Sequence, residues 1–184
     1  VWPGHGRTVA GHPGKVNVLP GCHLTPGDID ELRWIIEEFG LDPVFLPDLS
    51  GSLDGHVPDD FVPTSLGGIS LDEIRAMGRA VHTLALGDQM RPAAVALELK
   101  TGVPYTVFDR LTGLGPCDDF IALLSKISAM PVPTRFRRQR SQLVDAMLDG
   151  HFHFGHKKVA LGAEPDLLCA AGHFLTEMGA ELSV

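Results

Sequence analysis

The chain has 184 residues, of which 44% are hydrophobic and 21% charged, a composition typical of a folded globular protein rather than a disordered one. Its 15 Lys and Arg stand against 23 Asp and Glu, giving a formal net charge of −8. This balance argues against a nucleic-acid-binding protein, which needs cationic surface to displace counterions from phosphates. No stretch approaches the roughly 20 consecutive apolar residues of a membrane-spanning helix.

The first residues and the cysteines give little sign of special chemistry. Residues 1–14 are rich in Gly, Pro, His and Arg without periodicity, and we predict a linker or arm there. The N-terminus has no apolar core of a signal peptide. Because the chain begins with Val1 instead of an initiator Met, we expect a segment of a longer polypeptide. Cys22, Cys117 and Cys169 lie far apart, which predicts neither a disulfide framework nor a zinc site and favours a reducing cytosol.

From residue 15 to residue 130, short apolar runs alternate with helical patterns. Thr25, Pro26 and Asp28 have the features of a helix start: a hydroxyl at the N-cap, a proline at the first position and an acid at the third. Ser70 and Glu73 form a capping-box pattern that predicts the next helix after a long loop. We predict strands at 15–19, 43–46, 82–86 and 105–108, and helices at 26–39, 71–80, 89–101 and 118–130.

The pattern changes at residues 131–133, where Pro-Val-Pro breaks the chain. Between residues 131 and 158, six Lys and Arg stand against two Asp, so this stretch has a net charge of +4 while the rest of the chain has −12. We predict a helix at 136–148. A strand at 158–161, a helix at 165–178 and a strand at 180–184 then form a β-α-β unit.

Strands that alternate with helices predict an α/β fold, a parallel-sheet, Rossmann-like αβα sandwich. In open sheets of this kind, ligands bind beside the loops that follow the carboxyl ends of the strands. We therefore divide the chain into an arm at 1–14, a central α/β domain at 15–130, a long connecting helix and loop at 131–156, and the beginning of a further α/β domain at 157–184.

The loop at residues 46–56 is the most polar stretch at that expected ligand-facing edge. It combines acids, hydroxyls and an imidazole with glycines that let the backbone approach a neighbour closely. Its spacing does not match a calcium-binding EF-hand. The alternative is a set of Asx and Ser turns that satisfy their own backbone. As a partner-facing or ligand-facing set we single out Asp48, Ser50, Ser52, Asp54 and His56.

Three further features carry possible chemistry. Residues 151–156 read His-Phe-His-Phe-Gly-His, which either offers imidazoles to a metal or forms an extended stretch with Phe152 and Phe154 buried. Cys117 stands at the predicted start of a helix, where its thiol pKa would be lowered, and Cys169 is predicted to lie in the core. None of these forms a catalytic constellation, so a binding or assembly role fits the residues better than catalysis.

Four stretches of the chain form recognisable motifs. They are VNVLPGCHLTPGDIDEL at 16–32, LPDLSGSLDGH at 46–56, RQRSQLVDAMLDGHF at 138–152 and AEPDLLCAAGHFLTEMGAE at 163–181. Together they resemble the nitrogenase component 1 superfamily, and the resemblance runs from about residue 15 to the end of the chain. The last two stretches are shared across that superfamily, whereas LTPGD followed by the loop at 46–56 favours its cofactor-assembly scaffold subunits over the enzyme's own subunits.

The resemblance implies an architecture, cofactors and partners. Members have three α/β domains, and this chain is similar to the second domain and the start of the third. The scaffold pairs with a NifE-like subunit in a heterotetramer that carries a [4Fe–4S] cluster and an iron–molybdenum cofactor precursor. Transient partners are NifB, the nitrogenase iron protein and apo-nitrogenase. The cluster's cysteine ligand belongs to the N-terminal domain, so we expect no metal or cofactor in this segment.

The resemblance also places the helix around residues 138–152 at a subunit interface. In the enzyme's β subunit, a similar helix supplies two acids to a divalent cation, and Asp145 and Asp149 match those positions. The other ligands of that cation belong to the N-terminal domain, so we assign no metal here. The predicted interface residues are Arg135, Arg137, Arg138, Arg140, Asp145 and Asp149.

We expect a cytoplasmic scaffold of nitrogen fixation that has no catalytic residue and no complete active site in this segment. One alternative is a β-type subunit of a nitrogenase or of dark-operative protochlorophyllide reductase, both oxidoreductases. Another is an α/β module that binds a small metabolite through the loop at 46–56. Neither nucleic acid nor a membrane is expected as a partner.

Overall fold

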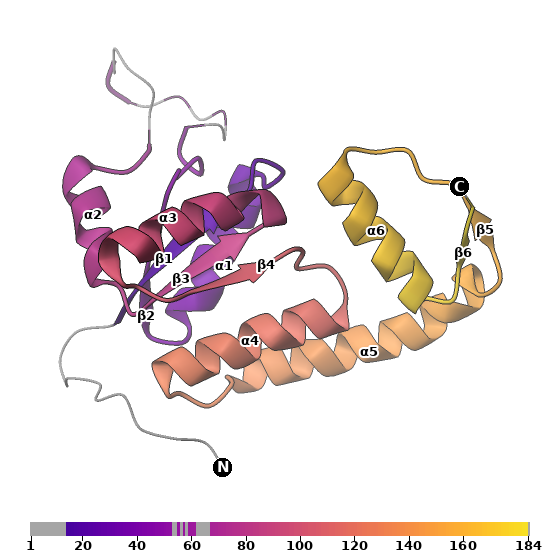
Figure 1. Cartoon of the computed structure of the whole chain (residues 1–184). Helices are drawn as coiled ribbons and strands as arrows, with labels where there is room; N and C mark the ends of the chain where they lie inside the picture. The colour runs from indigo at the N-terminus through magenta and orange to yellow at the C-terminus, as the bar shows by residue number, and fades with distance from the viewer. Residues whose placement is uncertain (1–13, 53–54, 56, 58, 62–66, 184) are drawn as a thin grey trace.

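In the computed structural model, four parallel strands form a central sheet in the order β2-β1-β3-β4 (Figure 1). The chain therefore crosses over between strands, as the alternating pattern predicted. The strands are β1 (Gly14–Pro20), β2 (Leu41–Phe45), β3 (His82–Leu86) and β4 (Tyr105–Phe108). The structure describes residues 14–52, 55, 57, 59–61 and 67–183.

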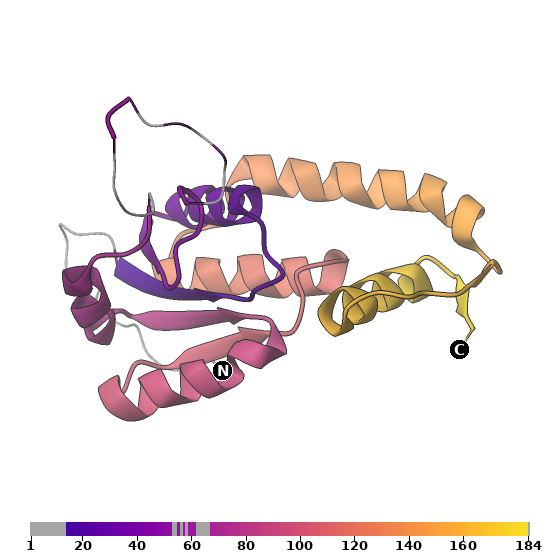
Figure 2. The same cartoon turned by 90° about the horizontal axis from the view of Figure 1, so that it is seen from above.

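Helices cover both faces of this sheet, which gives the predicted αβα sandwich (Figure 2). One face packs against α1 (Pro26–Glu37), α4 (Leu114–Ser128) and the first turn of α5 (Thr134–Phe154). The other face packs against α3 (Arg91–Thr101) and the short 3₁₀ helices η1 (Met77–Arg79) and η2 (Asp88–Met90), while α2 (Leu71–Ala76) leads into η1 and buries none of its residues.

Both predicted capping boxes are present. Thr25 Oγ1 accepts a hydrogen bond from the Asp28 amide at 3.3 Å, and the Asp28 carboxylate accepts one from the Thr25 amide at 2.8 Å. Ser70 and Glu73 make the same reciprocal pair. The Ser70 hydroxyl and the Ser70 amide both donate to the Glu73 carboxylate, and these two bonds lower the pKa of that carboxyl. Each box satisfies two amides that a helix start otherwise leaves unpaired, which fixes where α1 and α2 begin.

The core on the α1 side is built from side chains that the helical spacing already grouped together. Ile29 and Ile36 of α1 are buried against β1 and β3. Aromatic rings extend the core toward α5, where Phe39 stacks on Phe136 with ring centroids 5.8 Å apart. Phe108 of β4 meets Phe120 of α4 edge to face at 5.4 Å. The first contact brings the first turn of α5 into the core, and the second joins α4 to β4.

A polar pair lies within the opposite face of the sheet. Asn17 of β1 is fully buried, and its amide donates to the Met77 carbonyl at 3.0 Å and to Thr83 Oγ1 at 3.1 Å. These bonds tie η1 to two neighbouring strands. The side-chain amide oxygen of Asn17, Oδ1, has no hydrogen-bond partner among the described residues.

The chain ends in a smaller C-terminal unit, drawn in yellow in Figure 1, to which α5 leads. A parallel pair of short strands accompanies one helix in this unit. Its elements are β5 (Lys158–Val159), α6 (Pro165–Glu177) and β6 (Glu181–Leu182). Both strands are shorter than predicted. None of the described helices combines the length and the apolar character needed to cross a membrane.

The prediction of an extended stretch at 151–156 is wrong. α5 continues through Phe154, and the Gly155 amide closes it by donating to the His151 carbonyl at 2.8 Å. Phe152 is 84% exposed instead of buried. The alternation of His and Phe resembled a strand pattern, but helical hydrogen bonding from the preceding turns carries through it.

Candidate functional site

The loop after β2 starts in a network of its own polar groups. The Asp48 carboxylate accepts from Arg33 of α1 at 2.5 Å and from the Ser50 hydroxyl at 2.7 Å. Ser52 donates weakly to the Leu49 carbonyl at 3.4 Å. These are the bonds of locally satisfied turns, the alternative interpretation of this loop. Contact between the loop and a partner therefore stays a prediction.

Two glycines bring the beginning and the end of the long loop together. A side chain on Gly67 would come within 2.9 Å of the Gly51 backbone, so this close approach depends on residues without a Cβ. Gly67 also has a φ of +72°, which other residues rarely adopt. Asp54 and His56, the remaining members of the predicted set, lie outside the described residues.

Three of the four arginines predicted to contact another subunit already have partners within the chain. The Arg135 guanidinium lies 4.3 Å from the centre of the Trp34 ring. Arg137 donates to Thr134 Oγ1 at 3.1 Å. A role for these arginines in subunit contact stays a prediction.

Arg140 has the strongest of these pairings, a two-pronged contact with Asp118 of α4. Its Nε and Nη2 each lie 2.7 Å from one Asp118 oxygen, and these bonds hold the pKa of the Asp118 carboxyl below its usual range. The pair joins α5 to α4. Arg138 has no recorded hydrogen bond, ion pair or ring contact with any described residue.

Asp145 and Asp149 are exposed one turn apart on α5. Within the part of the chain that the structure describes, no three His, Cys, Asp or Glu side chains gather closely enough to hold a metal ion. The expectation of no metal in this segment stays a prediction. An interface role for the two aspartates is likewise untested.

Two of the three cysteines, Cys117 and Cys169, differ from what the sequence predicted for them. The Cys117 thiol donates to the Leu111 carbonyl at 3.1 Å, and burial together with Asp118 raises its pKa instead of lowering it. Cys169 is exposed on α6, so its prediction as a core residue is wrong. Cys22 is exposed as well. Helical spacing placed Cys169 on an apolar face, but no described element covers that part of α6.

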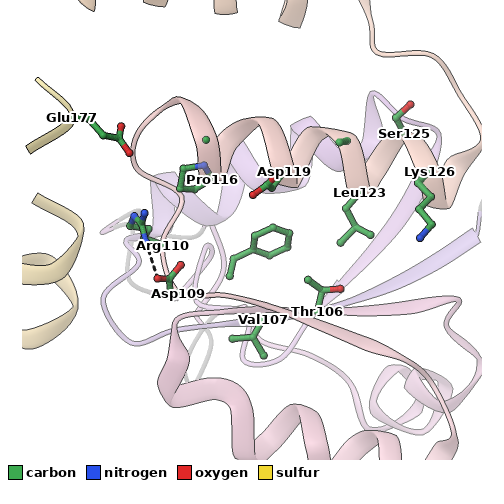
Figure 3. A pocket seen from close by; sticks show the side chains of 13 residues that line it. Thr106, Val107, Asp109, Arg110, Pro116, Asp119, Leu123, Ser125, Lys126 and Glu177 are labelled. Carbon is green, nitrogen blue, oxygen red and sulfur yellow. Dashed lines mark hydrogen bonds and ion pairs between the residues drawn. The ribbon is translucent and has the colours of Figure 1, made fainter. Parts of the chain in front are cut away.

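Sequence reasoning missed a cavity of about 960 Å³ beside the edge strand β4 (Figure 3). Leu123 of α4 and Thr106 of β4 point toward one another across it, and Glu177 of α6 stands at one end. Asp109 and Arg110 follow directly on β4 and line the same space. Their position after a predicted strand was the signal that would have found them, because ligands meet parallel sheets at that edge.

Comparisons with known proteins match almost the whole chain. The family model "Nitrogenase component 1 type Oxidoreductase" matches residues 5–184. "Nitrogenase iron-molybdenum cofactor biosynthesis protein NifN" of Bradyrhizobium diazoefficiens is 63% identical over 94% of this chain and 37% of that protein. The protein of the same name from a Nostoc species is 44% identical over 91% of the chain and 38% of its own length.

A solved structure, "Nitrogenase Cp1 at pH 6.5", has a similar fold. It superimposes with a TM-score of 0.84 and 31% identity, covering 96% of this chain and 39% of that one. The chain therefore spans less than half the length of each of these proteins.

Proposed function

The chain belongs to the family of nitrogenase component 1 type oxidoreductases, and from this membership we propose that it is part of a scaffold subunit on which the iron–molybdenum cofactor of nitrogenase is assembled. The predicted family and the predicted Rossmann-like parallel fold are both confirmed. One observation carries the proposal: identity is 63% to a protein named for cofactor biosynthesis and 31% to the solved nitrogenase chain.

In this proposal the complete protein pairs with a NifE-like subunit in a heterotetramer. The complex holds a [4Fe–4S] cluster and a cofactor precursor, and NifB, the nitrogenase iron protein and apo-nitrogenase are its transient partners. These groups and partners follow from the resemblance of the sequence to the scaffold branch. We place the cluster outside this segment because the segment's own three cysteines, Cys22, Cys117 and Cys169, are far apart in the sequence.

The outer side of α5 is our proposed contact with another subunit. Arg138 has no recorded partner among the described residues, and Asp145 and Asp149 are exposed on the same helix. Leu148 and Phe152 expose apolar surface beside them, 65% and 84% respectively. Protein interfaces have an apolar centre and a polar rim. The exposed apolar side chains of α5 would form such a centre, and its charged side chains would form the rim.

The test is purification of the full-length protein with its NifE-like partner. We expect the complex to contain iron and a cofactor precursor and to activate apo-nitrogenase in vitro. Arg138→Glu should weaken the complex without changing the unfolding of the subunit, because exposed charges affect association more than folding. Arg75→Glu, a charge reversal on α2, is the matched control and should leave assembly intact. An unchanged complex with Arg138→Glu would remove α5 from the proposed interface.

The loop at 46–56 needs two variants, because part of it is locally bonded. Asp48→Ala should lower stability through loss of the Arg33 and Ser50 contacts, by roughly 0.5–1.5 kcal/mol. If the loop meets a partner or the precursor, Asp54→Ala should reduce activation of apo-nitrogenase at unchanged stability. Normal activation with Asp54→Ala would leave only the turn interpretation.

The competing function is that of a β-type catalytic subunit, which the fold shared with the solved nitrogenase chain favours. A purified complex of that kind would reduce substrate when supplied with the iron protein and an electron source. A scaffold complex would instead activate apo-nitrogenase and show little reduction of its own. Measuring both activities on one preparation separates the two proposals.

A further inference from the structure

Arg110 is a charged side chain with fewer partners than its burial calls for. It follows β4 directly, and its side chain is only 19% exposed. Its one recorded partner is the neighbouring Asp109, whose oxygen lies 2.8 Å from Nη1. The buried Nε has no hydrogen-bond partner among the described residues. A guanidinium has five N–H donors, and a charge taken out of water is costly unless several of them are bonded.

The position of Arg110 is where this architecture binds ligands. It lines three cavities, of about 960, 270 and 440 Å³. The two smaller ones lie between the carboxyl edge of the sheet and α6. Gly87 after β3 and Asp166 of α6 both line the 270 Å³ cavity. The 440 Å³ cavity falls within the usual range for small-molecule pockets, which is about 300–1,000 Å³.

Three of the acids that line the two smaller cavities have partners of their own, whereas Glu164 has none among the described residues. Asp88 pairs with Arg91 at 2.5 Å, and Asp166 lies 3.6 Å from His23 Nδ1. Asp28 is held in the capping box of α1. Asp109 is the acid in direct contact with Arg110, and with 64% of its side chain exposed it is largely hydrated. Among the described residues, the direct charge partner of Arg110 is therefore a hydrated carboxylate, which offsets its positive charge only in part.

We propose that Arg110 binds the oxyanion of a small molecule, a carboxylate or a phosphate, in the cleft between the carboxyl edge of the sheet and α6. Planar, forked donors match such oxygens, and charge-assisted bonds of this kind are about twice as strong as neutral ones. This site is separate from the α5 surface and the loop at 46–56, so it does not depend on either of those assignments.

The experiment is calorimetric titration of the full-length protein with inorganic phosphate and with citrate at constant ionic strength. We expect saturable binding of at least one of them. Arg110→Met should weaken that binding ten-fold or more, and Arg110→Lys should weaken it less because the charge remains. Asp109→Asn should tighten it, since a competing carboxylate is removed.

Arg75→Met is the matched control, because Arg75 also pairs with a single aspartate at 2.8 Å but lies on α2, away from the cleft. The Arg75→Met protein should bind phosphate and citrate as tightly as the unchanged protein does. Binding that survives Arg110→Met, or falls equally with Arg75→Met, would overturn the site. Absence of binding to both probes would also overturn it.

Discussion

The central sheet and the C-terminal unit differ in how well they cover their own apolar surface. In the core around the central sheet, Phe39, Phe45 and Ile36 are almost completely buried. Beyond α5, the buried hydrophobic side chains among the described residues are Met178 and Ala180, which are 3% and 7% exposed, while Leu167 and Leu182 stay exposed. Stability therefore resides mainly in the central sheet, and the C-terminal unit is the part that we expect to open at lower free energy.

The largest effect that would test this contrast comes from two phenylalanines. Phe39→Ala removes a fully buried ring that stacks on Phe136, and we expect a loss of about 3–5 kcal/mol in the free energy of unfolding. Phe152→Ala removes an exposed ring and should change that free energy by less than about 0.5 kcal/mol. Urea denaturation measures both. Equal losses would mean that the far end of α5, which leads into the C-terminal unit, is as tightly packed as the sheet.

A smaller effect is expected from the buried polar pair. Asn17→Ala leaves the Met77 carbonyl and the Thr83 hydroxyl without their donor, and we expect a loss of about 1–3 kcal/mol by the same denaturation measurement. Thr176→Ala is the counterpart in the C-terminal unit, where it removes a bond to the Gly172 carbonyl. Thr176→Ala should lower the free energy of unfolding by less than Asn17→Ala does, because water can replace that bond. The reverse order would contradict the contrast.

The smallest effect concerns pH and again lies in the central sheet. Burial lowers the pKa of His82 below its usual value of 6.5, and Lys126 lowers it further. The unfolded chain then takes up the proton first, so stability falls as the pH drops below about 6.5. His82→Gln should flatten this dependence in denaturation curves taken at several pH values.

A control keeps the imidazole and removes its neighbour. Thr106→Val deletes the hydroxyl that lies 2.9 Å from His82 Nε2 but leaves the ring buried. The pH dependence should persist, since burial is the larger cause of the lowered pKa. A flat profile with Thr106→Val would assign the effect to the hydrogen bond instead.

Features set by neighbours in the sequence were predictable, whereas features set by distant packing were not. The Thr25 and Ser70 capping boxes depend on residues three positions away, and both formed as predicted. The exposure of Cys169 depends on which elements approach α6, and no local pattern contains that information. The burial of Arg110 likewise depends on α4, β4 and α6 coming together, although its place after a strand was visible.

The length of α5 has a mechanical consequence. Its 21 residues form one helix whose first turn is held by Phe136 in the core and whose far end leads into the C-terminal unit. At 1.5 Å per residue this rod is about 30 Å long, so a tilt of about 5° at its base moves the far end by roughly 2.6 Å. The length of α5 would therefore turn a small rotation at the sheet into a larger displacement of the C-terminal unit.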